Sequence, residues 1–416
     1  MLIDLFAGAG GLTEGFINKG YDFVSHVEMD INASKTLETR SLYHHLLDNG
    51  HEDSYYAYLK EEISRDQLFE DNKDFSKQVC SSVIQKEISI ETENAIIKKI
   101  KCNMKKLDIK KINGIIGGPP CQAYSLIGRS RDPNCMRNDP RNYLYHRYIN
   151  FLKEFDPDFF VFENVPGMLS AHEGTIFLDF KKCIQKLGYT IDYDILDSKY
   201  FDVLQSRKRL IAIGHKTDNN FFEVPFQLEG HDYIVYDTLN DLPSLEPGEG
   251  TDSPQKYLMG PSEYLINAGI RTGGKNDILI QHRARYHNEK DRKIYRLAVK
   301  VWNNEERRIK YDELPDDLKT HNNRKSFVDR FKVVAGNRKT SNTVVAHISK
   351  DGHYFIHPDI NQARSLTVRE AARIQSFPDN FKFEGPMTSQ FRQIGNAVPP
   401  LMAKGIAKKI KDVMEG

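Results

Sequence analysis

Cys121 follows two prolines, and its surroundings make it the clearest candidate for a nucleophile. Pro119 and Pro120 restrict the backbone in front of the thiol. The segment 122–141 behind it is polar and carries several arginines, and nearby positive charge favours the reactive thiolate. A lone cysteine is more often an inert, small hydrophobic residue. The rigid turn and the basic segment together predict a nucleophile that works beside an anionic substrate.

Glu163, Arg207 and Arg209 could complete a catalytic set around this thiol. Glu163 ends the apolar stretch 159–162, where a half-buried carboxyl can act as a general acid. Arg207 and Arg209 stand just before another apolar stretch and could face the same crevice. Taken singly, Glu163 would more often be a structural carboxylate and the arginines surface charges. Beside a thiol, the three side chains suit nucleophilic catalysis with acid assistance.

Glycines after the first apolar stretch indicate a cofactor. Gly8, Gly10 and Gly11 follow residues 2–6 and precede a helical pattern, so backbone N–H groups can approach a ligand closely. Their spacing is not the full dinucleotide fingerprint. Glu28, at the end of the second apolar stretch, is placed to accept hydrogen bonds from a ribose. The pattern predicts an adenosine-containing cofactor and leaves open whether it carries a nicotinamide, a phosphate or a sulfonium.

The residues just described stand at the ends of short apolar stretches that we expect to be strands. The expected strands are 2–6, 21–27, 114–116, 159–162, 189–196 and 210–213, with helices at 12–19 and 146–155. Strands that alternate with helices predict an α/β fold built on a doubly wound, Rossmann-like parallel sheet. Such sheets bind ligands beyond the carboxyl ends of their strands. The glycine turn, Glu28, Cys121 and Glu163 all fall there.

Composition and charge narrow the class of protein. The chain has 416 residues and no apolar run long enough to span a bilayer, and no basic leader precedes its first stretch. We therefore expect a cytoplasmic protein without membrane contact. Its five cysteines are scattered, which predicts reduced thiols and no metal centre. The net charge is +1, yet residues 271–340 carry 19 Lys and Arg against 10 Asp and Glu, which fits a polyanion-binding face or a solvated surface equally well.

Read in order, the motifs of the chain resemble those of the DNA (cytosine-5)-methyltransferase family. The matching segments are DLFAGAGG at 4–11, GPPCQ at 118–122, ENV at 163–165, QSRKR at 205–209, RSLTVREAARIQ at 364–375 with FPD at 377–379, and QIGNAVP at 393–399. One segment could arise by chance, whereas six in the family's order are highly specific. The absence of further regulatory domains suggests the bacterial restriction–modification type.

The resemblance implies a covalent mechanism on cytosine. A Cys121 thiolate would add to carbon 6 of the ring, which activates carbon 5 toward a methyl group. Glu163 would protonate or hydrogen-bond ring nitrogen 3, and Arg209, with Arg207 nearby, would hold the carbonyl oxygen or a flanking phosphate. The base that removes the carbon-5 proton stays open, because a water and a side chain are equally suitable.

S-adenosylmethionine is the cofactor that the resemblance implies. Phe6 would stack on the adenine, Glu28 would bind the ribose, Asp108 would meet the adenine amino group, and Asn396 would return to the methionine end. Met29 replaces a frequent aromatic residue, and Leu107, before Asp108, replaces a customary glycine. The expected cofactor residues are Phe6, Gly8, Gly10, Gly11, Glu28, Met29, Asp108, Pro119 and Asn396.

Duplex DNA is the implied substrate and partner. A cytosine inside a duplex cannot reach such a pocket, so the resemblance implies base flipping, with the segment 122–141 filling the gap. We expect a monomer that forms no stable complex with its cognate restriction endonuclease. The expected DNA-contacting residues are Gln122, Ser125, Arg129, Arg141, Arg283, Arg285, Arg338 and Thr343.

Two domains are expected. Residues 1–215 with 385–416 would form the catalytic and cofactor-binding domain, carrying a surface helical insertion at about 38–101. Residues 216–384, rich in turn signals and basic side chains, would form the small target-recognition domain. Aromatic residues of this second region are more typical of a core than of base stacking, namely Tyr286, Tyr295, Trp302 and Tyr311.

Two other functions are compatible with the sequence. The family's tRNA methyltransferase branch performs the same chemistry on RNA, but its Cys-Phe-Thr signature is absent and the recognition segment here is long. A DNA-binding subunit without turnover of its own is the other. The presence of Cys121, Glu163 and Arg209 argues against such a silent subunit.

Overall fold

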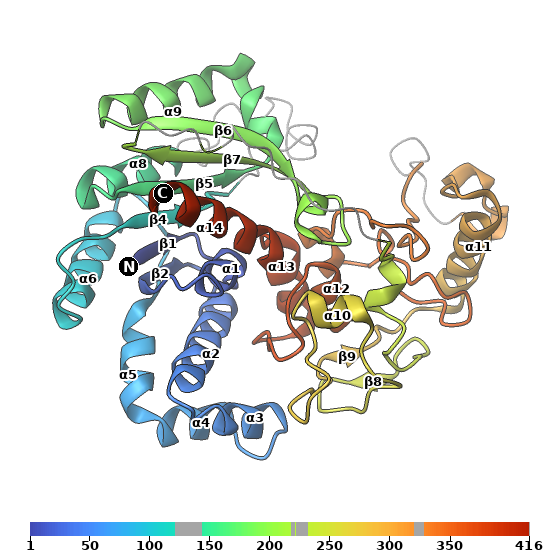
Figure 1. Cartoon of the computed structure of the whole chain (residues 1–416). Helices are drawn as coiled ribbons and strands as arrows, with labels where there is room; N and C mark the ends of the chain where they lie inside the picture. The colour runs from blue at the N-terminus through green and yellow to red at the C-terminus, as the bar shows by residue number, and fades with distance from the viewer. Residues whose placement is uncertain (121–143, 218–220, 222–231, 320–327, 416) are drawn as a thin grey trace.

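A seven-stranded sheet forms the centre of the protein, seen in a computed structural model that describes residues 1–120, 144–217, 221, 232–319 and 328–415 (Figure 1). The strand order is β3-β2-β1-β4-β5-β7-β6. The strands are β1 (Leu2–Leu5), β2 (Phe23–Glu28), β3 (Val83–Gln85), β4 (Gly114–Gly117), β5 (Phe159–Asn164), β6 (Thr190–Asp197) and β7 (Lys208–His215). Neighbouring strands are parallel except at β7, which is antiparallel to both β5 and β6. The expected doubly wound α/β sheet is confirmed, with one strand reversed.

Helices cover both faces of the sheet because its central strands are apolar on both sides. In β5, Phe160 and Phe162 pack on one face against α6 (Glu93–Lys106), α8 (Leu144–Phe155) and α9 (Thr175–Lys186). Phe159 and Val161 alternate to the other face and pack against α1 (Gly11–Ile17) and α14 (Pro400–Glu415). The C-terminal helix α14 therefore lies beside α1 at the other end of the chain (Figure 1).

The insertion expected at about 38–101 is more than a surface addition. It begins as a helical excursion through α2 (Ile31–Asp48), α3 (Asp53–Leu59), α4 (Arg65–Asp71) and α5 (Lys73–Ser82). It then supplies β3, which pairs in parallel with β2 and forms one edge of the sheet. The expectation of a purely helical insertion is therefore wrong. A three-residue strand is too short to show the alternation by which strands are recognised in a sequence.

Residues 232–319 and 328–384 form a less regular region beside the sheet. Its elements are β8 (Gly250–Thr251), β9 (His282–Arg283), α10 (Glu263–Asn267), α11 (Glu289–Glu305) and α12 (Val368–Ile374), which leads to α13 (Met387–Asn396). Tyr295, Trp302 and Tyr311 lie in one buried cluster, as expected for core residues. Tyr286 does not, since 80% of its surface is exposed.

Buried arginines hold the segment 364–379 in place. Arg364 pairs with Glu370 at 2.6 Å, and Arg373 pairs with Asp379 at 2.6 Å and Asp241 at 2.5 Å. Full desolvation of a charge is tolerated only when it is paired and hydrogen-bonded. The charged motif of this segment is thus a scaffold for α12 and α13. Across the described residues, no helix combines the length and apolar character needed to cross a membrane.

Candidate active site

The glycine turn lies at the carboxyl edge of the sheet, between β1 and α1. Gly8 and Gly10 have φ angles of +57° and +87°, which favour glycine, and Gly10 caps the start of α1. Gly8 donates its N–H to Glu28 Oε2 at 2.8 Å, which joins the turn to the end of β2. A Cβ on Gly11 would lie 2.3 Å from the carbonyl oxygen of Val398, so the turn also packs against the connection between α13 and α14.

Glu28 is fixed by two backbone groups and faces a partly open surface. Its other carboxylate oxygen accepts the N–H of Asp30 at 2.7 Å. Burial raises the pKa of Glu28, and these two N–H donors oppose the effect. Phe6 has a φ of +58° and is partly exposed, while the next residue after Glu28, Met29, is 57% exposed. A carboxylate flanked by two apolar side chains suits a ribose with an adjoining adenine.

Asp4 is a buried carboxyl at this edge that the sequence did not single out. It lies within β1 and accepts a hydrogen bond from Thr13 Oγ1 at 2.7 Å. Its Oδ1 has no hydrogen-bond partner among the described residues. Desolvation raises the pKa of Asp4 to about 7, against the opposing effect of the Thr13 hydrogen bond. The only signal in the sequence was an acid inside an apolar strand, which normally requires a special environment.

Glu163 and Arg209 form an ion pair at the same edge. Glu163 Oε1 lies 2.7 Å from Arg209 Nε, and the two side chains are 14% and 13% exposed. The pair joins two neighbouring strands. Glu163 of β5 is opposite Ile211 of the antiparallel strand β7, two residues after Arg209. β7 therefore begins where β5 ends. The reversed strand brings Arg209, near its start, to the acid at the end of β5.

The turn before Cys121 is anchored to β5. Asn164 donates from Nδ2 to the carbonyl oxygen of Pro119 at 3.3 Å, and both residues are buried. A Cβ on Gly118 would lie 2.3 Å from Glu163 Oε2, so a side chain there would displace the Glu163 carboxylate. The expected residues Cys121, Gln122, Ser125, Arg129 and Arg141 lie outside the described part of the chain.

Arg207 does not face the crevice with Arg209, and the expectation that it would is wrong. It is 1% exposed and donates from Nη1 to the carbonyl oxygen of Val344 at 2.7 Å, and from Nη2 to that of Gly395 at 3.2 Å. Its backbone N–H donates to Asp197 Oδ1 and Ser198 Oγ, each at 3.0 Å. Arg207 precedes β7, so the alternation of the strand does not govern its direction. It joins three distant segments.

Asp108 lies away from the cofactor residues. It follows α6 with a φ of +52°, is exposed, and precedes β4, whose amino end is at the edge opposite the glycine turn. The structure therefore does not support its expected place at the adenine. Glu87, by contrast, follows the carboxyl end of β3, the strand next to β2. The residue before it, Lys86, donates its N–H to the carbonyl oxygen of Glu28 at 2.9 Å.

Asn396 belongs to the C-terminal part of the chain and lies near the glycine turn. It ends α13 and is exposed, two residues before the Val398 carbonyl that contacts the glycine turn. Gly395 before it would place a Cβ 2.3 Å from the N atom of Ala346. The cofactor side of the site is thus closed by residues far apart in the chain.

The four described DNA-contact candidates do not share one surface. Arg338 and Thr343 line the same cleft. Arg283 is an exposed residue of β9 that pairs with Asp252 at 2.8 Å. Arg285 stacks on Phe391, with its guanidinium carbon 4.2 Å from the ring centroid, and burial lowers its pKa to about 10. Arg285 therefore resembles a packing residue more than a DNA contact.

The sheet and its carboxyl edge define an α/β enzyme that uses a nucleoside-type cofactor. Within that class, the chain belongs to the C-5 cytosine-specific DNA methylase family, whose model matches residues 1–63 and 69–412. A type II methyltransferase of Bacillus paralicheniformis, M.Bpa9945I, is 39% identical over 100% of this chain and 99% of its own length. M.DdeI of Desulfomicrobium norvegicum, another type II methyltransferase, is 31% identical over 98% of this chain and 88% of its own.

Solved structures share the fold. A DNA modification methyltransferase encoded within a prophage of E. coli matches with a TM-score of 0.64 and 24% identity, covering 100% of this chain and 99% of the other. The methyltransferase EhMeth of Entamoeba histolytica matches with a TM-score of 0.54 and 15% identity, covering 100% of this chain and 98% of the other. Both likenesses support the α/β architecture.

Proposed function

We propose that the protein transfers a methyl group from S-adenosylmethionine to carbon 5 of a cytosine in a specific duplex DNA sequence. Membership of the cytosine-5 family and the type II names of its relatives support this activity and a role in restriction–modification. The observation that carries the proposal is the Glu163–Arg209 pair, 2.7 Å apart at the edge that also holds the glycine turn. A base inserted there meets an acid, a cation and the turn before Cys121.

Base activation is assigned to Cys121, Glu163 and Arg209. The Cys121 sulfur forms a bond to carbon 6, and the ring's π electrons move to give enamine character at carbon 5. Glu163 donates a proton or a hydrogen bond to ring nitrogen 3, while Arg209 hydrogen-bonds the carbonyl oxygen at carbon 2. After methyl transfer, carbon 5 loses its proton, the carbon–sulfur bond breaks, and the aromatic ring is restored.

The residues at the glycine turn fit S-adenosylmethionine. Both Glu28 oxygens are oriented by backbone N–H groups and retain lone pairs for ribose hydroxyls, and the Gly8 position has nothing within 4 Å of where a Cβ would lie. Phe6 and Met29 would flank the adenine, and Glu87, which follows β3, would take the role expected of Asp108. When bound, the cofactor supplies an electrophilic methyl group on a sulfonium.

Duplex recognition follows from the two expected domains. We assign 1–215 with 385–416 to catalysis and 216–384 to target recognition, with one cytosine flipped into the site between them. Buried cluster residues from both parts pack together, including Leu204 and Ile394 with Val344 and Phe355. The two parts are therefore joined by a continuous core. One active site acts on one base, so we assign the activity to a monomer.

The test follows the label of tritiated S-adenosylmethionine into unmethylated genomic duplex DNA. The purified protein is compared with Cys121→Ser and with Cys102→Ser, which removes an exposed free thiol on α6. We expect label in 5-methylcytosine with the native protein and with Cys102→Ser, and none with Cys121→Ser. Duplex DNA carrying 5-fluorocytosine should trap the native protein covalently, because fluorine cannot leave as the proton does.

Three outcomes would contradict the proposal. Label on an amino nitrogen would move the chemistry away from carbon 5. Full activity of Cys121→Ser would remove the nucleophile. Label on tRNA but none on DNA would place the protein in the RNA branch of the family.

A further inference from the structure

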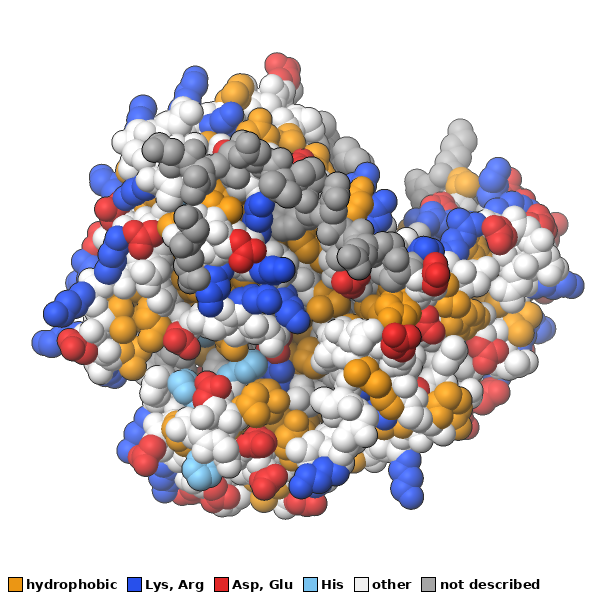
Figure 2. All heavy atoms as spheres, viewed as in Figure 1, with side chains coloured by type: hydrophobic (Ala, Val, Ile, Leu, Met, Phe, Trp, Pro, Cys, Tyr) orange, Lys and Arg blue, Asp and Glu red, His pale blue; other side chains and the backbone are white. Residues whose placement is uncertain are grey.

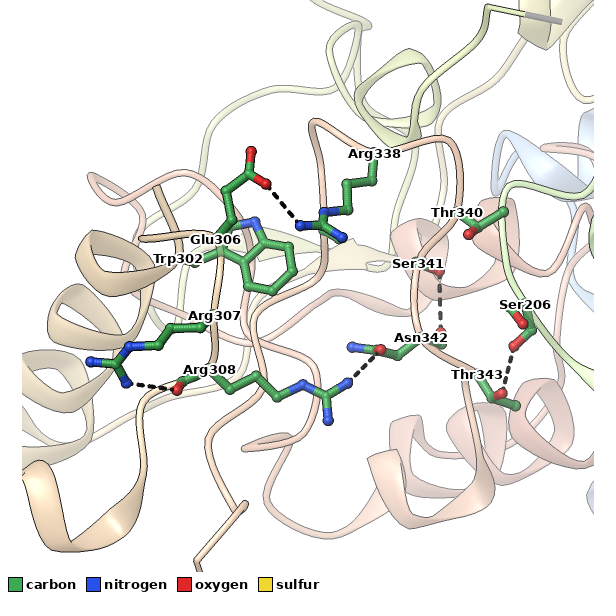
Figure 3. Close-up of a pocket in the computed structure, with 11 residues that line it drawn as sticks. Ser206, Trp302, Glu306, Arg307, Arg308, Arg338, Thr340, Ser341, Asn342 and Thr343 are labelled. Atoms are coloured by element: carbon green, nitrogen blue, oxygen red, sulfur yellow. Dashed lines mark hydrogen bonds and ion pairs between the residues drawn. The ribbon is translucent and has the colours of Figure 1, made fainter. Parts of the chain in front are cut away.

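A basic cleft of about 570 Å³ lies between the end of α11 and the segment 335–343 (Figure 3). Among the described residues that line it are Arg307, Arg308 and Arg338, together with one acidic residue, Glu306. Arg308 reaches across from the α11 side and donates to Asn342 Oδ1 at 2.6 Å. Arg307 and Arg308 also pair with carboxylates that do not line the cleft, those of Glu305, Glu313 and Asp329. Arg338 and Glu306 are the ion pair of which both members are described lining residues.

One end of the cleft adjoins the candidate active site. Thr343 donates its hydroxyl to the carbonyl oxygen of Ser206 at 2.6 Å, and both residues line the cleft. Arg209, the partner of Glu163, is three residues after Ser206. Three residues of chain span at most about 11 Å, so this end of the cleft lies close to Arg209. A duplex with a cytosine at Glu163 would bring its neighbouring base pairs to the cleft.

Arg338 is held in place before any ligand arrives. It donates from Nη2 to Glu306 Oε2 at 2.9 Å, and its guanidinium carbon lies 5.2 Å from the ring centroid of Trp302. The Trp302 ring is itself fixed by a hydrogen bond of 3.3 Å from Nε1 to Asn337. Arg338 remains 49% exposed. A restrained guanidinium loses little further side-chain entropy on binding, and its planar fork matches guanine O6 and N7.

Glu306 occupies a backbone position that normally excludes its residue type. It ends α11 with a φ of +52° and a ψ of +26°, a left-handed conformation in which glycine or asparagine is usual. Its side chain is 63% exposed, so core packing does not account for a glutamate there. An unfavourable backbone conformation beside a cleft is a reason to look for a chemical role of its carboxylate.

The carboxylate beside Arg338 distinguishes between two parts of DNA. A phosphate approaching Arg338 would be repelled by Glu306, because both carry negative charge at short range. A guanine–cytosine pair has no such conflict: guanine O6 and N7 accept from arginine, and the cytosine amino group donates to a carboxylate. The pairing of one arginine with one glutamate therefore fits a base-pair edge better than the sugar–phosphate backbone.

We propose that Arg338 and Glu306 recognise a guanine–cytosine base pair of the target sequence. Arg338 donates to guanine O6 and N7, and Glu306 orients Arg338 and accepts from the cytosine amino group. The inference rests on the proposed function, because it takes duplex DNA as the substrate. It adds the class of sequence that the protein methylates.

The experiment is methylation of a duplex library with randomised positions around a fixed cytosine, read by bisulfite sequencing. The full-length protein is compared with Arg338→Ala, Arg338→Lys and Glu306→Gln. Arg292→Ala is the matched control, because Arg292 lies on α11 in a similar pair with Glu246, at 2.5 Å, and does not line the cleft. Circular dichroism of every variant checks that it is folded.

We expect Arg338→Ala to reduce the preference for guanine at one position by about ten- to hundredfold. Arg338→Lys should do the same, since lysine keeps the charge but lacks the fork. Glu306→Gln should weaken the preference less, and Arg292→Ala should keep the native profile. A uniform loss of methylation in Arg338→Ala, rescued by lysine, would overturn base recognition in favour of a phosphate contact. An unchanged profile would overturn it too, whereas a native protein that methylates no DNA would overturn the proposed function itself.

Discussion

Two arginine–glutamate pairs of this protein differ in burial more than in chemistry. Glu163 and Arg209 are 14% and 13% exposed at the sheet edge, whereas Glu306 and Arg338 are 63% and 49% exposed in the cleft. The first pair is held by two neighbouring strands, and the second by a helix end and a loop. Figure 2 shows one face of the molecule on which Lys and Arg side chains gather beside a hollow.

Burial decides what each pair can do. In the sheet edge, partial exclusion of water strengthens the interaction and fixes both groups where charge develops on a substrate. In the cleft, water weakens the pair, so a base edge can replace solvent on either group at small cost. The same two side chains therefore suit catalysis in one place and recognition in the other. Four predictions can break or sharpen this contrast.

The largest effect is expected at the buried pair. Arg209→Ala removes the donor to the base and leaves Glu163 without its partner, so we expect kcat to fall by about hundred- to thousandfold. Single-turnover methylation at saturating cofactor measures the loss, and Arg292→Ala serves as the control. Binding of S-adenosylmethionine should stay within about threefold. A loss confined to KM for DNA would show that Arg209 contacts the duplex and not the reacting base.

Arg207→Ala is expected to lower the stability of the protein, whereas Arg209→Ala is expected to lower kcat. Its removal leaves buried carbonyl oxygens of Val344 and Gly395 without donors, which we expect to lower the free energy of unfolding by about 3 kcal/mol. Urea unfolding measures the change, and Arg338→Ala, at an exposed site, should lose less than about 1 kcal/mol. A stable Arg207→Ala protein without activity would return Arg207 to the catalytic set.

The third prediction concerns Asp4, a buried acid that pairs with no arginine among the described residues. The pKa of Asp4 is raised from 3.8 to about 7, so the folded protein holds this proton more tightly than the unfolded chain. The contribution of Asp4 to the free energy of unfolding is greatest below pH 4 and constant above about pH 7. Between these values it falls by no more than roughly 1.4 kcal/mol per pH unit.

Asp4→Asn removes this titration and serves as the measurement. Urea unfolding of both proteins at pH 5 and pH 8 isolates Asp4, because all other groups are shared. We expect the stability of Asp4→Asn relative to the native protein to rise from pH 5 to pH 8. A difference that does not depend on pH would mean that Asp4 is ionised in the folded state.

The smallest effect is expected at the exposed pair. Glu306→Gly relieves the left-handed backbone, so the free energy of unfolding should rise by about 0.5–1 kcal/mol. The same variant should weaken the preference for guanine in the methylation library. A gain in stability with a loss of selectivity would separate recognition from folding, whereas a loss of stability would make Glu306 a structural residue.

Much of the fold and half of the site follow from local sequence. Each central strand is a short apolar stretch that ends in a functional group, so the positions of the glycine turn, Glu28 and Glu163 could be predicted together. The order of motifs pointed to the family to which the chain belongs. These features can be predicted from the sequence because each depends on residues only a few positions away in the chain.

Only the tertiary structure decided which arginine meets Glu163. Arg207 and Arg209 are two residues apart, yet one joins buried loops and the other begins a strand. Asp108 was expected beside the adenine, but it precedes β4 at the opposite edge of the sheet. β3, which ends beside β2, is too short to be recognised in the sequence. The pairing of Glu306 with Arg338 joins a helix end to a distant loop. Contacts between remote segments depend on packing of the whole chain, and no local pattern of residues encodes them.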